Sequence, residues 1–126
     1  MLSTSEPFSG FAVDDIDVAE AFYGEVLGLE VERQGEMLTL GLGSGAEVFV
    51  YPKPDHRPAT FTILNFPVED IDRAVDVLAG RGVSLLRYDH VPHDARGIVR
   101  PPQDGGPLIA WFEDPAGNVL AVLQDQ

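Results

Sequence analysis

The chain has 126 residues, of which 44% are hydrophobic and 23% charged, so it has the length and composition of one globular domain. Its formal net charge is −13, from 21 acidic against 8 basic residues, and phosphate binding needs clustered Lys and Arg, so nucleic acids and anionic membranes are poor candidate partners. The absence of cysteine excludes disulfides and thiolate ligands, and the sequence shows neither a long apolar run nor a signal-like start, so we expect a cytoplasmic protein.

The first half of the chain is predicted to contain one helix and four strands. A short apolar stretch at residues 8–13 predicts a strand, and apolar residues at helical spacing predict a helix over 15–26. Asp15 or Asp17 can cap this helix, and Gly28 ends it. Three further strands are predicted, with glycine-containing turns between them, at residues 29–34, 37–42 and 47–51.

The second half repeats this order after a polar, proline-rich connector. A strand at residues 60–66 precedes a helix at 71–79 and a strand at 83–88. Residues 89–106 are polar and rich in Pro and Gly, which predicts a long mobile loop with a short strand near 97–100. A closing hairpin is expected from two last strands, at residues 108–112 and 119–123.

A repeated phrase indicates that the two halves are a duplication. The sequence VDDID at residues 13–17 recurs as VEDID at 68–72, and each copy follows an apolar stretch and opens an amphipathic one. Two copies do not make a solenoid, so they indicate twin units that pair to bury their apolar faces. Each half reads as strand, helix and three strands, an α+β plan with helices on one face of a largely antiparallel sheet. A pocket between the halves is the natural place for function.

Strand alternation assigns side chains to the two faces of each sheet. In the first strand, Phe11 and Val13 are predicted to face the helix and Phe8 to face away. In the matching strand of the second half, Leu64 and Phe66 are predicted to face the helix. The residues of this half predicted to face away from the helix are Phe61, Ile63, Asn65, Pro67, Trp111, Val119 and Ala121.

Two motifs carry a resemblance to a known superfamily. The phrase VDDID, followed by FY at 22–23 and VLGL at 26–29, resembles the opening of the glyoxalase, bleomycin-resistance and extradiol dioxygenase superfamily, also called vicinal oxygen chelate. FEDPAGN at 112–118 resembles its closing hairpin. The resemblance implies one domain over 1–126, built as two tandem βαβββ modules (about 8–52 and 60–124, joined by a connector at 53–59). It further implies curled mixed sheets around a cleft, and a homodimer.

The resemblance also implies where a metal ion would bind. Metalloenzymes of this superfamily hold a divalent ion with one side chain, usually His or Glu, from each of four strands. These positions fall on Phe8, Ile63 and Ala121 and near Phe49, with Glu47 on the same strand face as Phe49. Since Phe, Ile and Ala have no lone-pair donors, we expect no metal and no cofactor. A dry, aromatic-lined cleft suited to an apolar or aromatic small molecule is expected instead.

The candidate cleft combines aromatic, aliphatic and polar side chains. Trp111 could stack on a planar ligand, or it could belong to the core or to a dimer interface. The amide of Asn65 needs a partner, either a ligand or a neighbouring strand end. The residues predicted to line the cleft are Phe8, Glu47, Phe49, Tyr51, Ile63, Asn65, Trp111 and Ala121.

The long loop supplies a candidate lid. His93, Arg96 and Arg100 could close over an anionic ligand, although the two arginines could equally pair with surface carboxylates. His90 and His93 have a spacing that suits metal binding on a helix. Pro92 between them and the loop context favour solvated histidines instead.

Three functions remain open from the sequence. The leading hypothesis is a small-molecule-binding protein of the glyoxalase/bleomycin-resistance type that lacks the usual metal site. The second is a metal-dependent lyase, isomerase or dioxygenase with relocated ligands, and the third is a ligand-free interaction or regulatory module. No nucleophile constellation and no phosphate-binding loop is present to define another reaction. The relocated ligands of the second hypothesis would be drawn from Glu47, His90, His93 and Glu113.

Overall fold

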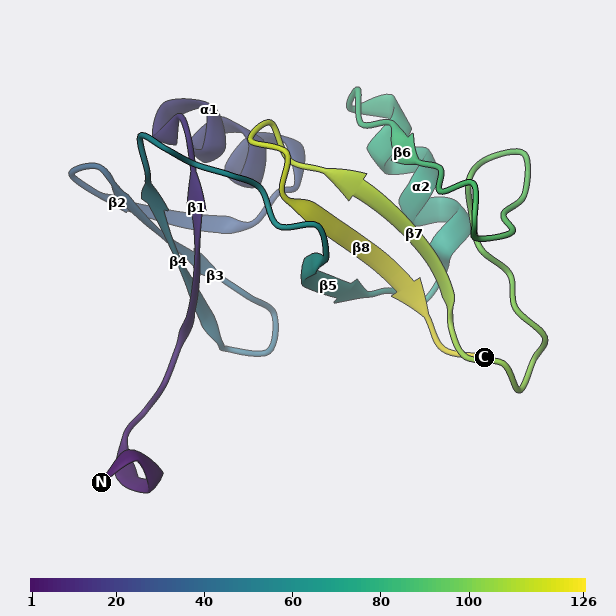
Figure 1. Cartoon of the computed structure of the whole chain (residues 1–126), viewed down its shortest axis with the longest axis horizontal. Helices are drawn as coiled ribbons and strands as arrows, with labels where there is room; N and C mark the ends of the chain where they lie inside the picture. Colours follow the sequence, from purple (N-terminus) through teal and green to yellow (C-terminus); the bar gives the residue numbers. More distant parts are fainter. The chain divides into compact units, whose positions relative to one another are not determined.

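The chain divides into two compact units, each containing one copy of the predicted plan. The computed structural model describes residues 1–126, and contacts within the chain separate Met1–Pro58 from Ala59–Gln126. Each unit contains one mixed four-stranded sheet and one principal helix (Figure 1). The division falls inside the predicted connector, so each unit corresponds to one βαβββ module.

The first unit contains one mixed sheet in the order β1-β4-β3-β2. Strand β1 is parallel to β4, and the other neighbouring strands are antiparallel. The sheet is open rather than curled, which departs from the sequence expectation, while the α+β plan itself is confirmed. The elements of this unit are η1 (Leu2–Thr4, a 3₁₀ turn), β1 (Ser9–Val13), α1 (Ile16–Ala21), η2 (Phe22–Val26, a π-helical turn), β2 (Glu30–Gln34), β3 (Met37–Gly41) and β4 (Glu47–Pro52).

The second unit repeats this topology in the order β5-β8-β7-β6. Strand β5 is parallel to β8, and the remaining pairs are antiparallel. The order strand, helix and three strands is therefore confirmed in both units. The elements of the second unit are β5 (Thr62–Pro67), α2 (Ile71–Gly80), β6 (Leu85–Leu86), β7 (Leu108–Glu113) and β8 (Val119–Gln124).

The repeated acidic phrase starts the helix of each unit. The carboxylate of Asp15 accepts hydrogen bonds from the backbone N–H of Asp17 and Val18, at 3.0 and 3.1 Å. In the second copy, Asp70 accepts one from the backbone N–H of Arg73 at 3.1 Å. Such caps satisfy N–H groups that have no partner inside the helix. The phrase therefore has a structural role, at the change from strand to helix.

The core of each unit lies between its helix and one face of its sheet. In the second unit, α2 presents Ile71, Val75 and Leu78 to the sheet, and all three are buried. Burial of such side chains is the main stabilising contribution in a domain of this size. The buried sheet residues opposite α2 are Ala110, Phe112, Leu120 and Val122. Those of the first unit are Val13, Leu38, Leu40, Val48 and Val50.

The first helix is shorter than predicted. Instead of one helix over 15–26, α1 continues into the π-helical turn η2, where the N–H of Leu27 donates to the carbonyl of Phe22 at 2.9 Å. The π turn accompanies the burial of two consecutive aromatic side chains, Phe22 and Tyr23. Their rings pack edge to face at 5.2 Å.

The segment between α2 and β7 also differs from the prediction. The strand expected over 83–88 is reduced to the two residues of β6. The short strand expected near 97–100 is a single bridge, in which Val99 pairs with Ile109.

Neither helix reaches the length and apolar character that crossing a membrane requires.

The closing hairpin is organised by one buried carboxylate. Asp114 is 4% exposed, and its Oδ1 accepts hydrogen bonds from the backbone N–H groups of Ala116 and Asn118, at 2.9 and 2.8 Å. Its Oδ2 accepts a third hydrogen bond, from Nδ2 of Asn118 at 3.0 Å. Gly117 has a φ of 85°, which favours glycine. The DPAGN sequence thus fixes the register of β7 and β8.

Replacing Asp114 with Ala should destabilise the second unit. The substitution leaves Asn118 and the turn amides without their acceptor, which is expected to lower the free energy of unfolding by about 2–3 kcal/mol. Urea denaturation followed by circular dichroism measures this change. The neighbouring exposed residue gives the control, since Glu113→Ala should change the value by less than about 0.5 kcal/mol. Equal effects of the two substitutions would contradict the role assigned to Asp114.

Candidate functional site

The sheet face of the first unit that points away from α1 carries three aromatic rings. Strand β1 pairs Gly10 with Phe49 and Ala12 with Tyr51, so Phe49 and Tyr51 share the face opposite the buried Val50. The ring of Phe8 lies 6.3 Å from that of Phe49 in an edge contact, and Phe49 stacks on Tyr51 at 6.0 Å. We call Phe8, Phe49 and Tyr51 the aromatic row.

The aromatic row leaves much of its surface uncovered. Phe8 is 74% exposed, and Phe49 and Tyr51 are half-buried. Gly10 lies close to Phe49, since a Cβ atom at Gly10 would lie 3.1 Å from the carbonyl oxygen of Phe49. Glu47 is exposed at the start of β4, on the same face. The face therefore offers flat apolar surface beside one carboxylate.

In the second unit the predicted residues meet on the corresponding sheet face. Ala121 pairs with Trp111 on one side and with Asn65 on the other, which places all three on one face. Phe112 and Leu120 are buried on the opposite face, with α2. Ala121 is buried and small, whereas Asn65 is exposed and its amide forms no hydrogen bond within the protein. The alternative in which Asn65 bonds to a strand end is not found.

Two neighbours fix the indole of Trp111. Its Nε1–H donates to Oγ1 of Thr62 at 3.1 Å, and the ring of Tyr88 packs edge-on at 5.4 Å. Trp111 is half-buried, so the indole is held in one orientation while part of its surface remains accessible. Because the Nε1–H is already bonded, Trp111 can offer a ligand its ring face rather than its donor. We call Trp111, Thr62 and Tyr88 the tryptophan platform.

The sequence analysis identified Trp111 but missed its two supports. Pairing with β8 shifts register between Thr62 and Leu64, and this irregularity brings Thr62 to Trp111, where strict alternation would turn it away. Ile63 lies within the irregularity and is half-buried. Tyr88 reaches Trp111 because Leu86, two residues earlier, pairs with Trp111, and this register is set by the structure.

The residues at the four implied metal positions do not suit a divalent ion. Phe8, Phe49, Ile63 and Ala121 supply no oxygen, nitrogen or thiolate donor. Over residues 1–126, no three His, Cys, Asp or Glu side chains are grouped so as to hold a metal ion. The relocated ligands considered from the sequence also have other surroundings. Nδ1 of His93 lies 3.0 Å from the carbonyl oxygen of Val91, and the ring of His90 lies 5.8 Å from that of Tyr88.

The two arginines of the candidate lid pair with carboxylates. Arg96 bonds to Asp72 at 3.0 Å and to Asp76, and Arg100 bonds to Asp72 at 2.6 Å and to Asp94 at 2.9 Å. These five residues, the loop clamp, attach the loop to α2. The carboxylate pairing weighed in the sequence analysis is therefore present, and closure over a ligand stays a prediction for His93, Arg96 and Arg100.

Charge and hydrogen bonding shift the pKa values of two clamp residues in opposite directions. Hydrogen bonds to Asp94 and Asp72 raise the pKa of Arg100, so it remains charged throughout the physiological range. For Asp94, partial burial by itself would raise the pKa, because it disfavours the charged carboxylate. Hydrogen bonds from Arg100 and from the backbone N–H of Ile98 and Arg96 outweigh burial, so the pKa lies below its ordinary value.

Comparison with known proteins assigns the chain to a superfamily. The family described as "Glyoxalase/Bleomycin resistance protein/Dioxygenase superfamily" matches residues 8–122. No sequence among curated proteins matches the chain significantly.

Solved structures share the fold at low sequence identity. FosX, a fosfomycin resistance protein from Listeria monocytogenes, superposes with a TM-score of 0.72 at 13% identity, covering 98% of this chain and 94% of its own. Lactoylglutathione lyase from Agrobacterium tumefaciens gives 0.67 at 22% identity, covering 96% and 93%. TnmS3, an antibiotic binding protein from Streptomyces sp. CB03234, gives 0.68 at 21% identity, covering 98% of each chain.

Acidification should weaken the loop clamp through Asp94. Because the pKa of Asp94 is lower in the folded protein than in the unfolded chain, its stabilisation is present above its ordinary pKa of about 4 and is lost as the pH falls through the lower folded value. The free energy of unfolding of the native protein should therefore exceed that of Asp94→Asn at pH 6, with the difference shrinking towards pH 3. Denaturant titrations across this range measure it. A difference that does not change with pH would contradict the assignment.

Proposed function

Because the chain belongs to the Glyoxalase/Bleomycin resistance protein/Dioxygenase superfamily, we propose that it is a metal-independent binding protein for an apolar or aromatic small molecule. The observation that carries the proposal is what lies on the helix-free sheet faces. Where metalloenzymes of the superfamily need donors, this chain has Phe8, Phe49, Ile63 and Ala121. The aromatic row and the tryptophan platform lie on these faces, and flat apolar surfaces of this kind suit organic ligands.

The surroundings of the rings favour a planar ligand with a polar edge. The indole of Trp111 is held by Thr62 and Tyr88, so a ligand stacking on it meets an already ordered surface and costs little side-chain entropy. The free amide of Asn65, on the same face as Trp111, can donate to and accept from a ligand. Separately, on the first unit, Glu47 supplies an acceptor beside the aromatic row. On either face taken by itself, a neutral or cationic aromatic compound with hydrogen-bond donors matches these groups, and the acidic composition of the chain disfavours an anion.

The structural relatives are compatible with binding as a function of this fold. TnmS3 is described as an antibiotic binding protein, without a named reaction. At 21% identity the relationship concerns the fold, so it supports a binding role in general and leaves the ligand to be defined by the residues of this chain.

The other two hypotheses receive less support. A metal-dependent enzyme needs three or more donors in one place, and the candidate donors do not form such a group. A ligand-free module predicts aromatic faces filled by the chain's own side chains, whereas Phe8 is 74% exposed. We therefore keep binding without a metal as the proposed function.

Replacing Trp111 with Ala should weaken ligand binding and preserve the fold. A thermal-shift screen of aromatic compounds and antibiotics identifies ligands, and calorimetry then gives the dissociation constant of each variant. Loss of the stacking surface is expected to raise the constant about tenfold or more. Thr62→Val removes the hydrogen bond to the indole but keeps the ring, so it should cause a smaller loss of affinity.

Two controls accompany this measurement. Val77→Ala changes an exposed side chain of α2 and should leave binding unchanged. The divalent ion content of the purified protein is measured with and without a chelator. The proposal would be wrong if no compound bound, if Trp111→Ala bound equally well, or if binding required a stoichiometric ion.

We further propose that the protein is a homodimer. In the first unit Met1 and Leu2 are 96% and 77% exposed. Strand β1 of the first unit and β5 of the second each have one sheet edge without a hydrogen-bonded strand. Exposed edges and apolar side chains are commonly covered by another chain. Light scattering should therefore give twice the chain mass of 13.7 kDa, and Leu2→Ser should shift the equilibrium towards the monomer. A monomer at high protein concentration would contradict the proposal.

A further inference from the structure

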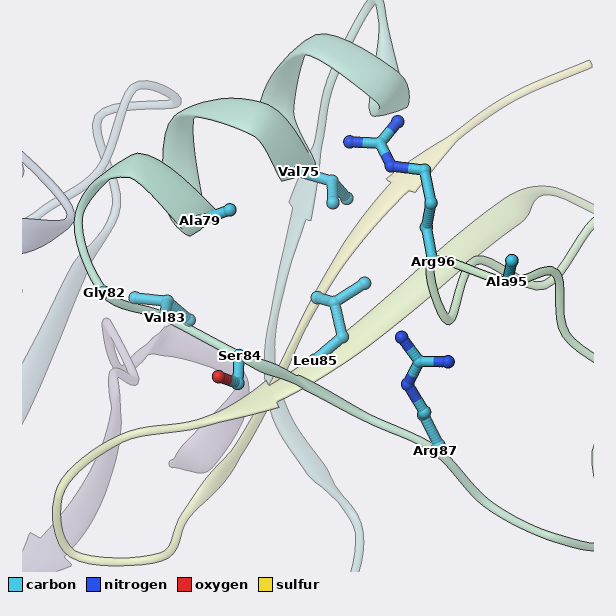
Figure 2. Close-up of a pocket in the computed structure, with 9 residues that line it drawn as sticks. All are labelled: Val75, Ala79, Gly82, Val83, Ser84, Leu85, Arg87, Ala95 and Arg96. Atoms are coloured by element: carbon cyan, nitrogen blue, oxygen red, sulfur yellow. The ribbon is translucent and has the colours of Figure 1, made fainter.

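A groove in the second unit lies apart from the sheet faces described above. It has a volume of about 650 Å³ and runs between the C-terminal half of α2 and the chain that passes through β6 (Figure 2). Volumes of this size are typical of small-molecule sites. Because it is bounded by α2, it lies on the helix side of the sheet, opposite the face of Trp111.

The groove combines apolar walls with positive charge at one end. Val75 and Ala79 of α2 form one wall, and Val83 and Leu85 form the other. Figure 2 shows the side chains of Arg87 and Arg96 on the same side of the groove, beyond Leu85. A molecule in the groove would therefore meet aliphatic groups along its length and guanidinium groups at one end.

The two arginines differ in what they bond to. The guanidinium of Arg96 is engaged by Asp72 and Asp76 in the loop clamp. The exposed side chain of Arg87 forms no ion pair and no hydrogen bond, although the chain has 21 acidic residues against 8 basic ones. A guanidinium left without a carboxylate in so acidic a chain is available to an external anion.

The stem of Arg87 is positioned by the loop. Gly97 has a φ of +97°, and a Cβ atom at that position would lie 3.3 Å from Cβ of Leu85 and 3.6 Å from Cγ of Arg87. The glycine thus lets the loop backbone pass close to both residues. The loop backbone therefore borders the aliphatic part of Arg87, a residue that is exposed overall.

We propose that this groove binds a small amphipathic carboxylate. Its apolar tail lies against Val75, Ala79, Val83 and Leu85, and its carboxylate accepts two hydrogen bonds from the guanidinium of Arg87. A carboxylate is favoured because its two oxygens match the planar fork of arginine. This site is independent of the proposed function, since the aromatic row and the tryptophan platform contribute none of its lining residues.

Octanoate below its micellar concentration is a suitable probe. Titration followed by amide chemical shifts should perturb residues of α2 and β6, and calorimetry gives the dissociation constant. Arg87→Gln should weaken octanoate binding about tenfold or more, because it removes the cationic partner of a charge-assisted pair. Octanol, which lacks the carboxylate, should likewise bind the native protein about tenfold or more weakly than octanoate. Ala79→Trp, which fills the groove from an exposed position, should abolish binding.

Matched variants distinguish binding in the groove from a general effect of removing positive charge. Arg73 is an exposed arginine of α2 whose side chain has no partner and does not line the groove, so Arg73→Gln should change octanoate affinity by less than about twofold. Binding of a planar compound to the Trp111 face should be unaffected by Arg87→Gln. The proposal is overturned if octanoate does not bind, if Arg87→Gln and Arg73→Gln have equal effects, or if the shifts map to the sheet faces instead.

Discussion

In each unit the first strand pairs in parallel with the last, and the rest of the structure depends on this pairing. Antiparallel neighbours can be joined by short turns, but a parallel pair needs a crossover, which here includes the helix and two further strands. The pairing brings the two ends of each module together, with the helix in the connection between them. It also sets side by side residues far apart in sequence, Gly10 with Phe49 and Asn65 with Ala121, and so builds the helix-free face.

Each sheet has two faces with different tasks. One face is apolar, lies against the helix and holds the module together, with side chains such as Leu38 and Phe112 almost fully buried. The other face is free of the helix, and there the same alternation places aromatic rings that the module does not need for its own core. This division explains how the implied metal positions can carry Phe, Ile and Ala without damage to the fold, since these residues are outside the helix-facing core.

Several of the few basic residues form ion pairs that join segments of the chain. Arg33 joins α1 to β2 through Asp17 and Glu20, at 2.6 and 2.9 Å, and Arg96 and Arg100 attach the long loop to α2. Ion pairs between side chains this exposed contribute little stability individually, but together they hold each segment in one position. Arg87 stands outside these networks, and its unpaired side chain adjoins the apolar walls of the groove.

The sequence alone was enough to predict the duplication, the order of elements, the helix caps and the alternation of faces, because these follow from local periodicity and from residues close in the chain. It also determined the apolar residues at the implied metal positions. Tertiary structure decided what depends on distant partners: the register shift that brings Thr62 to Trp111, the π turn after α1, and the pairing of Arg96 and Arg100 with α2. Each is a choice between locally equivalent conformations, and only packing and hydrogen bonding across the unit separate them in energy.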